Sequence, residues 1–92
     1  MIVRILTEGQ YKLDDDVLAR VNELDNACVS AVESGDEEQF RSTFGQLLDL
    51  VRSDGKPLAE DDLSESDVML PPPDLTMEEA AQEFSGDGLI PD

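Results

Sequence analysis

Two runs of apolar residues at helical spacing, separated by a short polar link, constrain the fold of this chain more than any other feature. The first run recurs at intervals of three or four residues, which places its members on one face of a helix. Its members are Val17, Val21, Leu24, Cys28 and Val32. Carboxylates at residues 14–16 can cap the free N–H groups at its start and face the positive end of the helix dipole. The sequence therefore predicts an amphipathic helix that ends at about Ser34.

A second amphipathic helix follows directly. Gly35 suits the left-handed position that ends a helix, and Asp36 suits the next N-cap, with Gln39 three residues further on. The apolar run consists of Phe40, Phe44, Leu47, Leu48 and Val51, and the stretch Asp-Gly-Lys-Pro at 54–57 ends it. Two helices with so short a link form an antiparallel αα-hairpin. The sequence leaves open whether they pair within one chain or across a homodimer.

The first residues predict a β-hairpin. Residues 2–6 are mostly β-branched, residues 10–13 alternate polar and apolar side chains, and Gly9 between them can adopt a positive φ. Because two strands alone are marginally stable in water, a third strand is expected, and residues 68–70 are the candidate. Pro71 would end that strand, since proline cannot donate to a ladder.

The last third of the chain predicts a short helix. Thr76 and Glu79 form a capping box, and one face carries Met77, Ala80, Ala81 and Phe84 before the helix ends near residues 85–86. Leu89 and Ile90 either fray or dock on the core. The predicted fold class is α+β: a small N-terminal β-hairpin with a third strand near 68–70, packed on an antiparallel αα-hairpin, with a short C-terminal helix. One domain is expected to cover residues 1–92.

The net charge of the chain is −17, and it is unevenly distributed. Residues 1–55 hold 12 acids against 5 bases, and residues 56–92 hold 11 acids against 1 base. Such a surface repels nucleic-acid phosphates and anionic lipid head groups, so direct binding to either is not expected. It would attract a basic partner surface. The alternative is that the acidity serves solubility alone.

The sequence offers few residues that could support catalysis or bind a metal ion. The chain has no histidine, and Cys28 lies on an apolar stripe, where burial makes a thiol inert. The acids at 14–16 lack the alternation of a calcium loop, and no glycine bends the acids at 60–62 into a cage. We therefore expect no enzyme activity, no cofactor and no metal site.

Several features point to a cytoplasmic protein. The N-terminal residues lack the basic region and long apolar run of a signal peptide, and Arg4 interrupts the one apolar stretch there. No run approaches the roughly 20 apolar residues that span a bilayer. The single cysteine cannot form an internal disulfide.

Residues 67–70, together with the acids before them, are the candidate partner surface. The apolar triplet 68–70 is costly to expose, so it is either a buried strand or an apolar patch with an acidic rim. Both interpretations hold together if the strand buries one face and shows the other. The candidate partner-binding residues are Glu60, Asp61, Asp62, Glu65, Asp67, Val68, Met69 and Leu70.

Three stretches carry a resemblance to a known family: the start IVRILTEGQY, the LPPPD before the capped helix, and the DGLIP near the end. In their order and spacing the chain resembles the PspA-associated domain proteins, the PspAA family, along essentially its whole length. None of these stretches is a catalytic signature.

The resemblance implies a small α+β domain that accompanies PspA, a coiled-coil protein of the envelope stress response that binds the inner face of a stressed membrane. The implied role is a non-catalytic accessory or regulator of PspA. Membrane contact would then be indirect, through recruitment by the PspA-like partner. The alternatives are an acidic nucleic-acid mimic and an antitoxin-like protein, each binding a basic partner.

Overall fold

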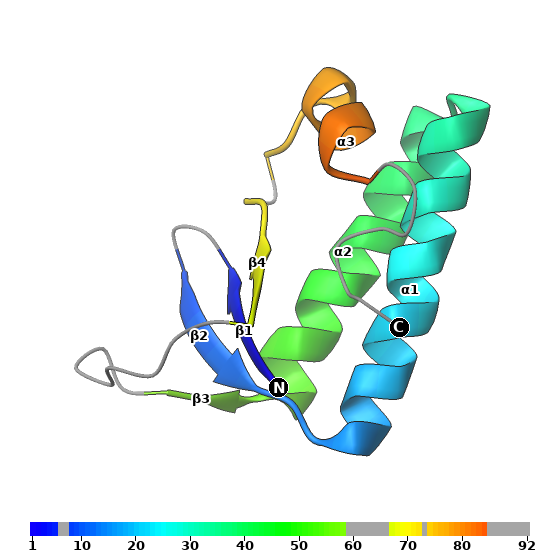
Figure 1. Cartoon of the computed structure of the whole chain (residues 1–92). Helices are drawn as coiled ribbons and strands as arrows, with labels where there is room; N and C mark the ends of the chain where they lie inside the picture. The colour runs from blue at the N-terminus through cyan, green and yellow to red at the C-terminus, as the bar shows by residue number, and fades with distance from the viewer. Residues whose placement is uncertain (6–7, 59–66, 73, 85–92) are drawn as a thin grey trace.

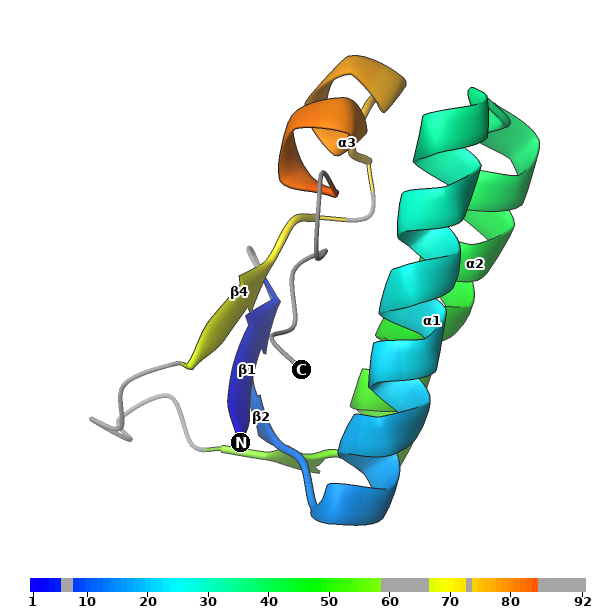
Figure 2. The ribbon, with the colours of Figure 1, turned by 45° about the vertical axis from the view of Figure 1, so that its right-hand side comes forward.

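The computed structural model has two layers, a mixed four-stranded sheet and a helical hairpin that covers one face of it (Figures 1 and 2). It describes residues 1–5, 8–58, 67–72 and 74–84. The elements are β1 (Ile2–Ile5), β2 (Gly9–Lys12), α1 (Asp15–Ser34), α2 (Glu37–Asp54), β3 (Lys56–Pro57), β4 (Val68–Leu70) and α3 (Met77–Glu83). The predicted α+β fold, with its β-hairpin, third strand, helical hairpin and short C-terminal helix, is confirmed.

The ends of α1 and α2 are set by the residues that the sequence singled out. The Asp14 side chain accepts a hydrogen bond from the Val17 N–H at 2.9 Å, and the Asp36 side chain accepts one from the Gln39 N–H at 3.1 Å. Gly35 has a φ of 73°, the left-handed conformation that a glycine adopts without steric cost. The helical hairpin therefore follows from local capping chemistry.

The sheet order is β3-β2-β1-β4, so β1 is a central strand. β1 pairs with β2 in an antiparallel register that sets Val3 opposite Tyr11, and with β4 in a parallel register that sets Val3 opposite Val68. Gly9 has a φ of 130°, as the predicted turn requires, while residues 6–7 of that turn lie outside the described residues. β4 ends at Leu70, immediately before the prolines.

The fourth strand, β3, was not predicted. The stretch Asp54-Gly55-Lys56-Pro57 was interpreted only as the end of α2, but Lys56 and Pro57 pair with Lys12 and Tyr11 of β2. Two residues carry no periodic signal, so only the position of α2 above the sheet brings them to β2. Proline is tolerated here because β3 lies at an edge of the sheet.

The core lies between the sheet and the two long helices. The strands contribute Val3, Ile5, Val68 and Leu70, which are at most 7% exposed. The helices contribute the apolar residues predicted from the sequence, except that Leu24 and Val32 of α1 are only half-buried. Val29 and Ala31 are buried in addition, which widens the predicted stripe. The buried residues of α1 and α2 are Val17, Val21, Asp25, Cys28, Val29, Ala31, Phe40, Thr43, Phe44, Leu47, Leu48 and Val51.

Three phenylalanines hold α3 on the helical hairpin. The ring centroids of Phe40 and Phe44 are 5.4 Å apart, and Phe84 meets both edge-on at 5.4 and 5.6 Å. The predicted capping box is present, because the Thr76 and Glu79 side chains each bond the other's backbone N–H. The prediction that Ala81 faces the core is wrong. One step of about 100° beyond the buried Ala80 turns its side chain to solvent. Leu89 and Ile90, which were expected to fray or dock, lie outside the described residues.

An ion pair ties the β1–β2 turn to the end of α2. The Arg52 Nε donates to the Glu8 Oε1 at 2.8 Å, and the Arg52 Nη1 donates to the Asp49 Oδ1 at 3.1 Å. The hydrogen bond from Arg52 lowers the pKa of Glu8 below its ordinary value of 4.5, and the same bond raises the pKa of Arg52.

Replacing Glu8 by Gln is expected to remove a pH-dependent part of the stability. Because the pKa of Glu8 is lowered in the folded state, its ion pair stabilises the fold fully above pH 4.5, and the contribution is lost as the pH falls further. Both side chains are partly exposed, so the contribution is at most about 1 kcal/mol. Urea unfolding of both proteins should show the difference near neutral pH and a smaller one near pH 3. A difference that does not change with pH would contradict this assignment.

Candidate interaction surface

β4 buries one face and exposes the other. Val68 and Leu70 are 7% and 0% exposed and lie in the core, whereas Met69 between them is 56% exposed. This follows from the alternation of side chains along a strand. Among the described residues, Met69 is the one large hydrophobic side chain that is exposed. The triplet is therefore a strand that buries Val68 and Leu70 and exposes Met69, and an apolar patch with an acidic rim stays a prediction.

Asp67 is held at the start of β4 by two hydrogen bonds with Ile2. The Ile2 N–H donates to the Asp67 Oδ2 at 2.9 Å, and the Asp67 N–H donates to the Ile2 carbonyl at 2.8 Å. The carboxylate is exposed, but its orientation is constrained by this pairing. The other four predicted acids, Glu60, Asp61, Asp62 and Glu65, lie outside the described residues.

The side of the sheet that faces away from the helices carries basic residues. Arg4 of β1 lies beside Met69 of β4, and Lys12 of β2 lies directly opposite Lys56 of β3. All four side chains are exposed. Arg4 is opposite Gln10, so Arg4 and Lys12 are diagonal neighbours, roughly 7–8 Å apart in a sheet of this kind. We call Arg4, Lys12, Lys56 and Met69 the cationic face. Gln10 lies between them but is buried, so it is not part of this open surface.

The three cations of this face form no ion pair within the part of the chain that the structure describes. The other three cations of the protein are all paired. Arg20 bonds Asp54 at 2.8 Å, Arg41 bonds Glu37 at 3.1 Å, and Arg52 bonds Glu8 and Asp49. In a chain with 23 acids and 6 bases, three neighbouring cations without a carboxylate partner are an unusual arrangement.

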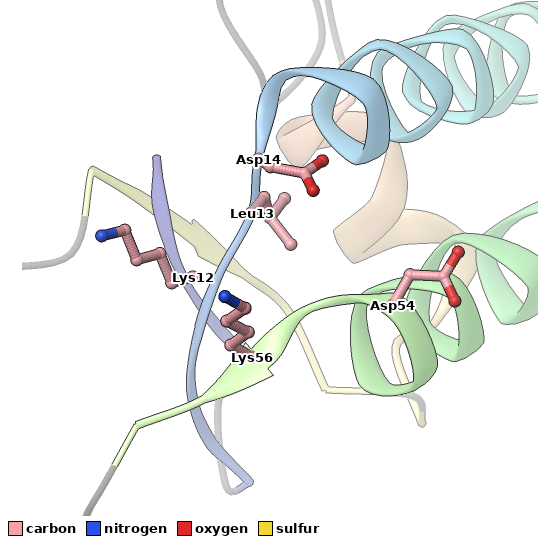
Figure 3. Close-up of a pocket in the computed structure, with 5 residues that line it drawn as sticks. All are labelled: Lys12, Leu13, Asp14, Asp54 and Lys56. Carbon is pink, nitrogen blue, oxygen red and sulfur yellow. The ribbon is translucent and has the colours of Figure 1, made fainter.

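A shallow pocket of about 150 Å³ adjoins this face where the strands meet the helices. Lys12 and Lys56 line it from the sheet, Asp14 and Asp54 line it from the helix ends, and Leu13 lies between them (Figure 3). The lysines therefore come from the sheet side of the hollow and the carboxylates from its helix side. Such an arrangement can hold a chain segment that carries both charge and apolar groups.

The cationic face was not among the surfaces predicted from the sequence. Alternation along residues 2–5 and 10–12 places Arg4 and Lys12 on one face of a hairpin, so that part of the signal was present. Lys56 could not be added, because β3 was interpreted as a helix end. The predictions instead followed the acidic residues, which are far more numerous.

Comparison with known proteins identifies the family of this chain. The model of the family described as PspA-Associated protein matches residues 1–92. The chain belongs to the PspAA family. No curated protein and no solved structure matched it. By its description the family is associated with PspA.

The one thiol of this PspAA protein is not poised for reaction. Cys28 is buried in α1, and desolvation together with the charge of Asp25 raises the pKa of its thiol to about 12. At neutral pH the thiol is therefore protonated and a poor nucleophile. Within the described ranges, no three histidine, cysteine or acidic side chains lie together as a metal site would require.

No helix in the described part of the chain combines the length and hydropathy needed to cross a bilayer.

Proposed function

We propose that this protein is a non-catalytic accessory protein that binds a PspA-like coiled-coil protein in the envelope stress response. The observation that carries the proposal is the match of the whole chain, residues 1–92, to the PspA-Associated family. We infer that one domain performs this role in the cytoplasm. Its partner would recruit it to the inner face of the membrane.

The proposed contact combines an apolar anchor with acidic residues. Met69 supplies the anchor, because an exposed methionine adapts its shape to a partner surface. Asp67 lies next to it with a constrained carboxylate, and the acids at 60–62 and 65 precede it in the sequence. These groups suit a helix that carries both apolar and basic residues.

The acids that cap the helices argue against nucleic-acid mimicry. A mimic requires carboxylates that follow the spacing of phosphates along one exposed face. Here Asp14 and Asp36 accept hydrogen bonds from helix N-termini, so their positions are explained by capping.

Replacing Met69 by Ser is expected to weaken binding to the PspA-like protein of the same cell by about fivefold to tenfold. The reason is that apolar area is no longer buried at the contact. Affinity would be measured by isothermal titration, and complex size by size-exclusion chromatography with light scattering. The thermal midpoint should hardly change, because more than half of the side chain is already exposed.

A Met69→Leu variant is the matched control and should bind like the wild type, since it keeps the apolar volume. Neutralising the acids at 60–62 and 65 tests the charged part of the contact. If the wild-type protein and the PspA-like protein elute separately at low and at physiological salt, direct binding is refuted.

A further inference from the structure

The unpaired cations of the cationic face require an explanation that the acidic surface does not provide. Lys12 and Lys56 are direct cross-strand neighbours in the β2–β3 register, so their charges lie on the same side of the sheet. Like charges in this position destabilise a sheet, and no ion pair within the described residues relieves them. The chain has many carboxylates, yet Arg20, Arg41 and Arg52 are the cations that they neutralise. Carboxylates from another molecule would neutralise the three cations that are left, Arg4, Lys12 and Lys56.

The shape of the charge pattern indicates what kind of molecule supplies those carboxylates. Acids border the cations, since Asp14 and Asp54 line the adjoining pocket and Asp67 immediately precedes β4. A bilayer surface is wide and uniformly negative, so it would meet these acids as well as the cations and be repelled by them. A single chain segment is narrow enough to contact the cations one by one. Met69 beside Arg4 adds an apolar contact at one end.

A second copy of this chain fits less well. If two cationic faces met, Arg4, Lys12 and Lys56 would face their own counterparts. If the cationic face met the acidic helices of another copy, two molecules of net charge −17 would have to approach each other.

We propose that the cationic face binds an acidic, amphipathic segment of the PspA-like partner. Carboxylates of that segment pair with Arg4, Lys12 and Lys56, and an apolar side chain of it contacts Met69. This inference rests on the proposed function. The proposed contact then includes the cationic face as well as the acidic residues around Met69. The partner would accordingly offer acidic groups to the cationic face and basic groups to the acidic residues.

The test compares two variants with the same change in net charge. Replacing Lys12 and Lys56 by Gln is expected to weaken binding to the purified PspA-like protein by about tenfold and to reduce the salt dependence of the affinity. The matched control is Arg41→Glu, which changes an exposed residue near the start of α2, at the opposite end of the helix from β3. It should leave the affinity within about twofold of the wild type.

The outcomes separate this inference from the proposed function. If the wild type does not bind, the proposed function fails. If the wild type binds and both variants bind equally well, only the inference is overturned. It is also overturned if the double variant loses thermal stability while its affinity is unchanged, because the chain's own carboxylates would then occupy the face.

Two further measurements test whether a lipid surface or a second copy of the chain binds the cationic face instead. Sedimentation with phosphatidylcholine–phosphatidylserine vesicles should show no binding of the wild type. Binding that the double variant abolishes would assign the face to lipid and overturn the inference. Light scattering of the protein alone should show no dimer that depends on Lys12 and Lys56, and such a dimer would overturn it as well.

Discussion

Phe84→Ala is expected to lower the free energy of unfolding by about 3–5 kcal/mol, the usual range for removing a buried phenylalanine. The side chain is 0% exposed and forms edge-on contacts with both Phe40 and Phe44. It is also the residue that ends α3, whose helical residues include one buried side chain, Ala80. The substitution therefore removes the main contact that holds α3 on the helical hairpin.

Urea unfolding followed by circular dichroism would measure this loss, and hydrogen exchange would show whether α3 detaches before the rest unfolds. Glu83→Ala is the matched control, since its exposed side chain lies one residue earlier on the same helix. It should change the stability by no more than about 0.5 kcal/mol. A loss below about 1 kcal/mol for Phe84→Ala would mean that α3 contributes little to the folded state.

Gly55→Ala is expected to destabilise the protein by about 1–3 kcal/mol, the usual cost of an overpacked site. Gly55 lies between α2 and β3 with its N–H bonded to the Val51 carbonyl at 3.0 Å. A methyl group there would collide with that same carbonyl oxygen and would lie 2.9 Å from the Leu13 Cδ2 and 3.2 Å from the Tyr11 Cβ. A backbone oxygen cannot move away as a flexible side chain can, so β3 must shift.

The matched control is the other glycine of this region, Gly45 in the middle of α2. A methyl group added to Gly45 meets no heavy atom within 4 Å. Gly45→Ala should therefore stabilise the protein, by about 0.5–1 kcal/mol, because alanine loses less backbone entropy in a helix. Thermal or urea unfolding of the two variants should show shifts of opposite sign. Destabilisation by both would contradict the steric explanation for Gly55.

Gly55→Ala also tests how the cationic face is built. Lys56 follows Gly55 directly and reaches its place opposite Lys12 only because β3 pairs with β2. If β3 is displaced, binding of an acidic segment should weaken even though no charge has changed. Gly45→Ala should leave that binding intact.

Parts of this protein were predictable from short stretches of sequence. The limits of α1 and α2 follow from Asp14, Gly35 and Asp36, whose effects act on the nearest turn of backbone. The capping box of α3 and the end of β4 before the prolines are equally local. The burial of Cys28, and with it the raised pKa of its thiol, follows from helical periodicity.

The candidate surface was predicted in part. Alternation along β4 was enough to expect one buried and one exposed face, and Met69 is the exposed residue. The acids at 60–62 and 65 lie outside the described residues, so their place in the surface stays a prediction.

The sequence by itself determined the helical hairpin, the capped α3 and the acidic character of the chain, because these depend on neighbours a few residues apart. Tertiary structure alone decided the parallel pairing of β1 with β4, the existence of β3 and the opposition of Lys12 to Lys56. These contacts join residues more than 40 positions apart. No local pattern encodes such pairings, since they form only when the helices bury their apolar faces on the sheet and bring its edge strands into register.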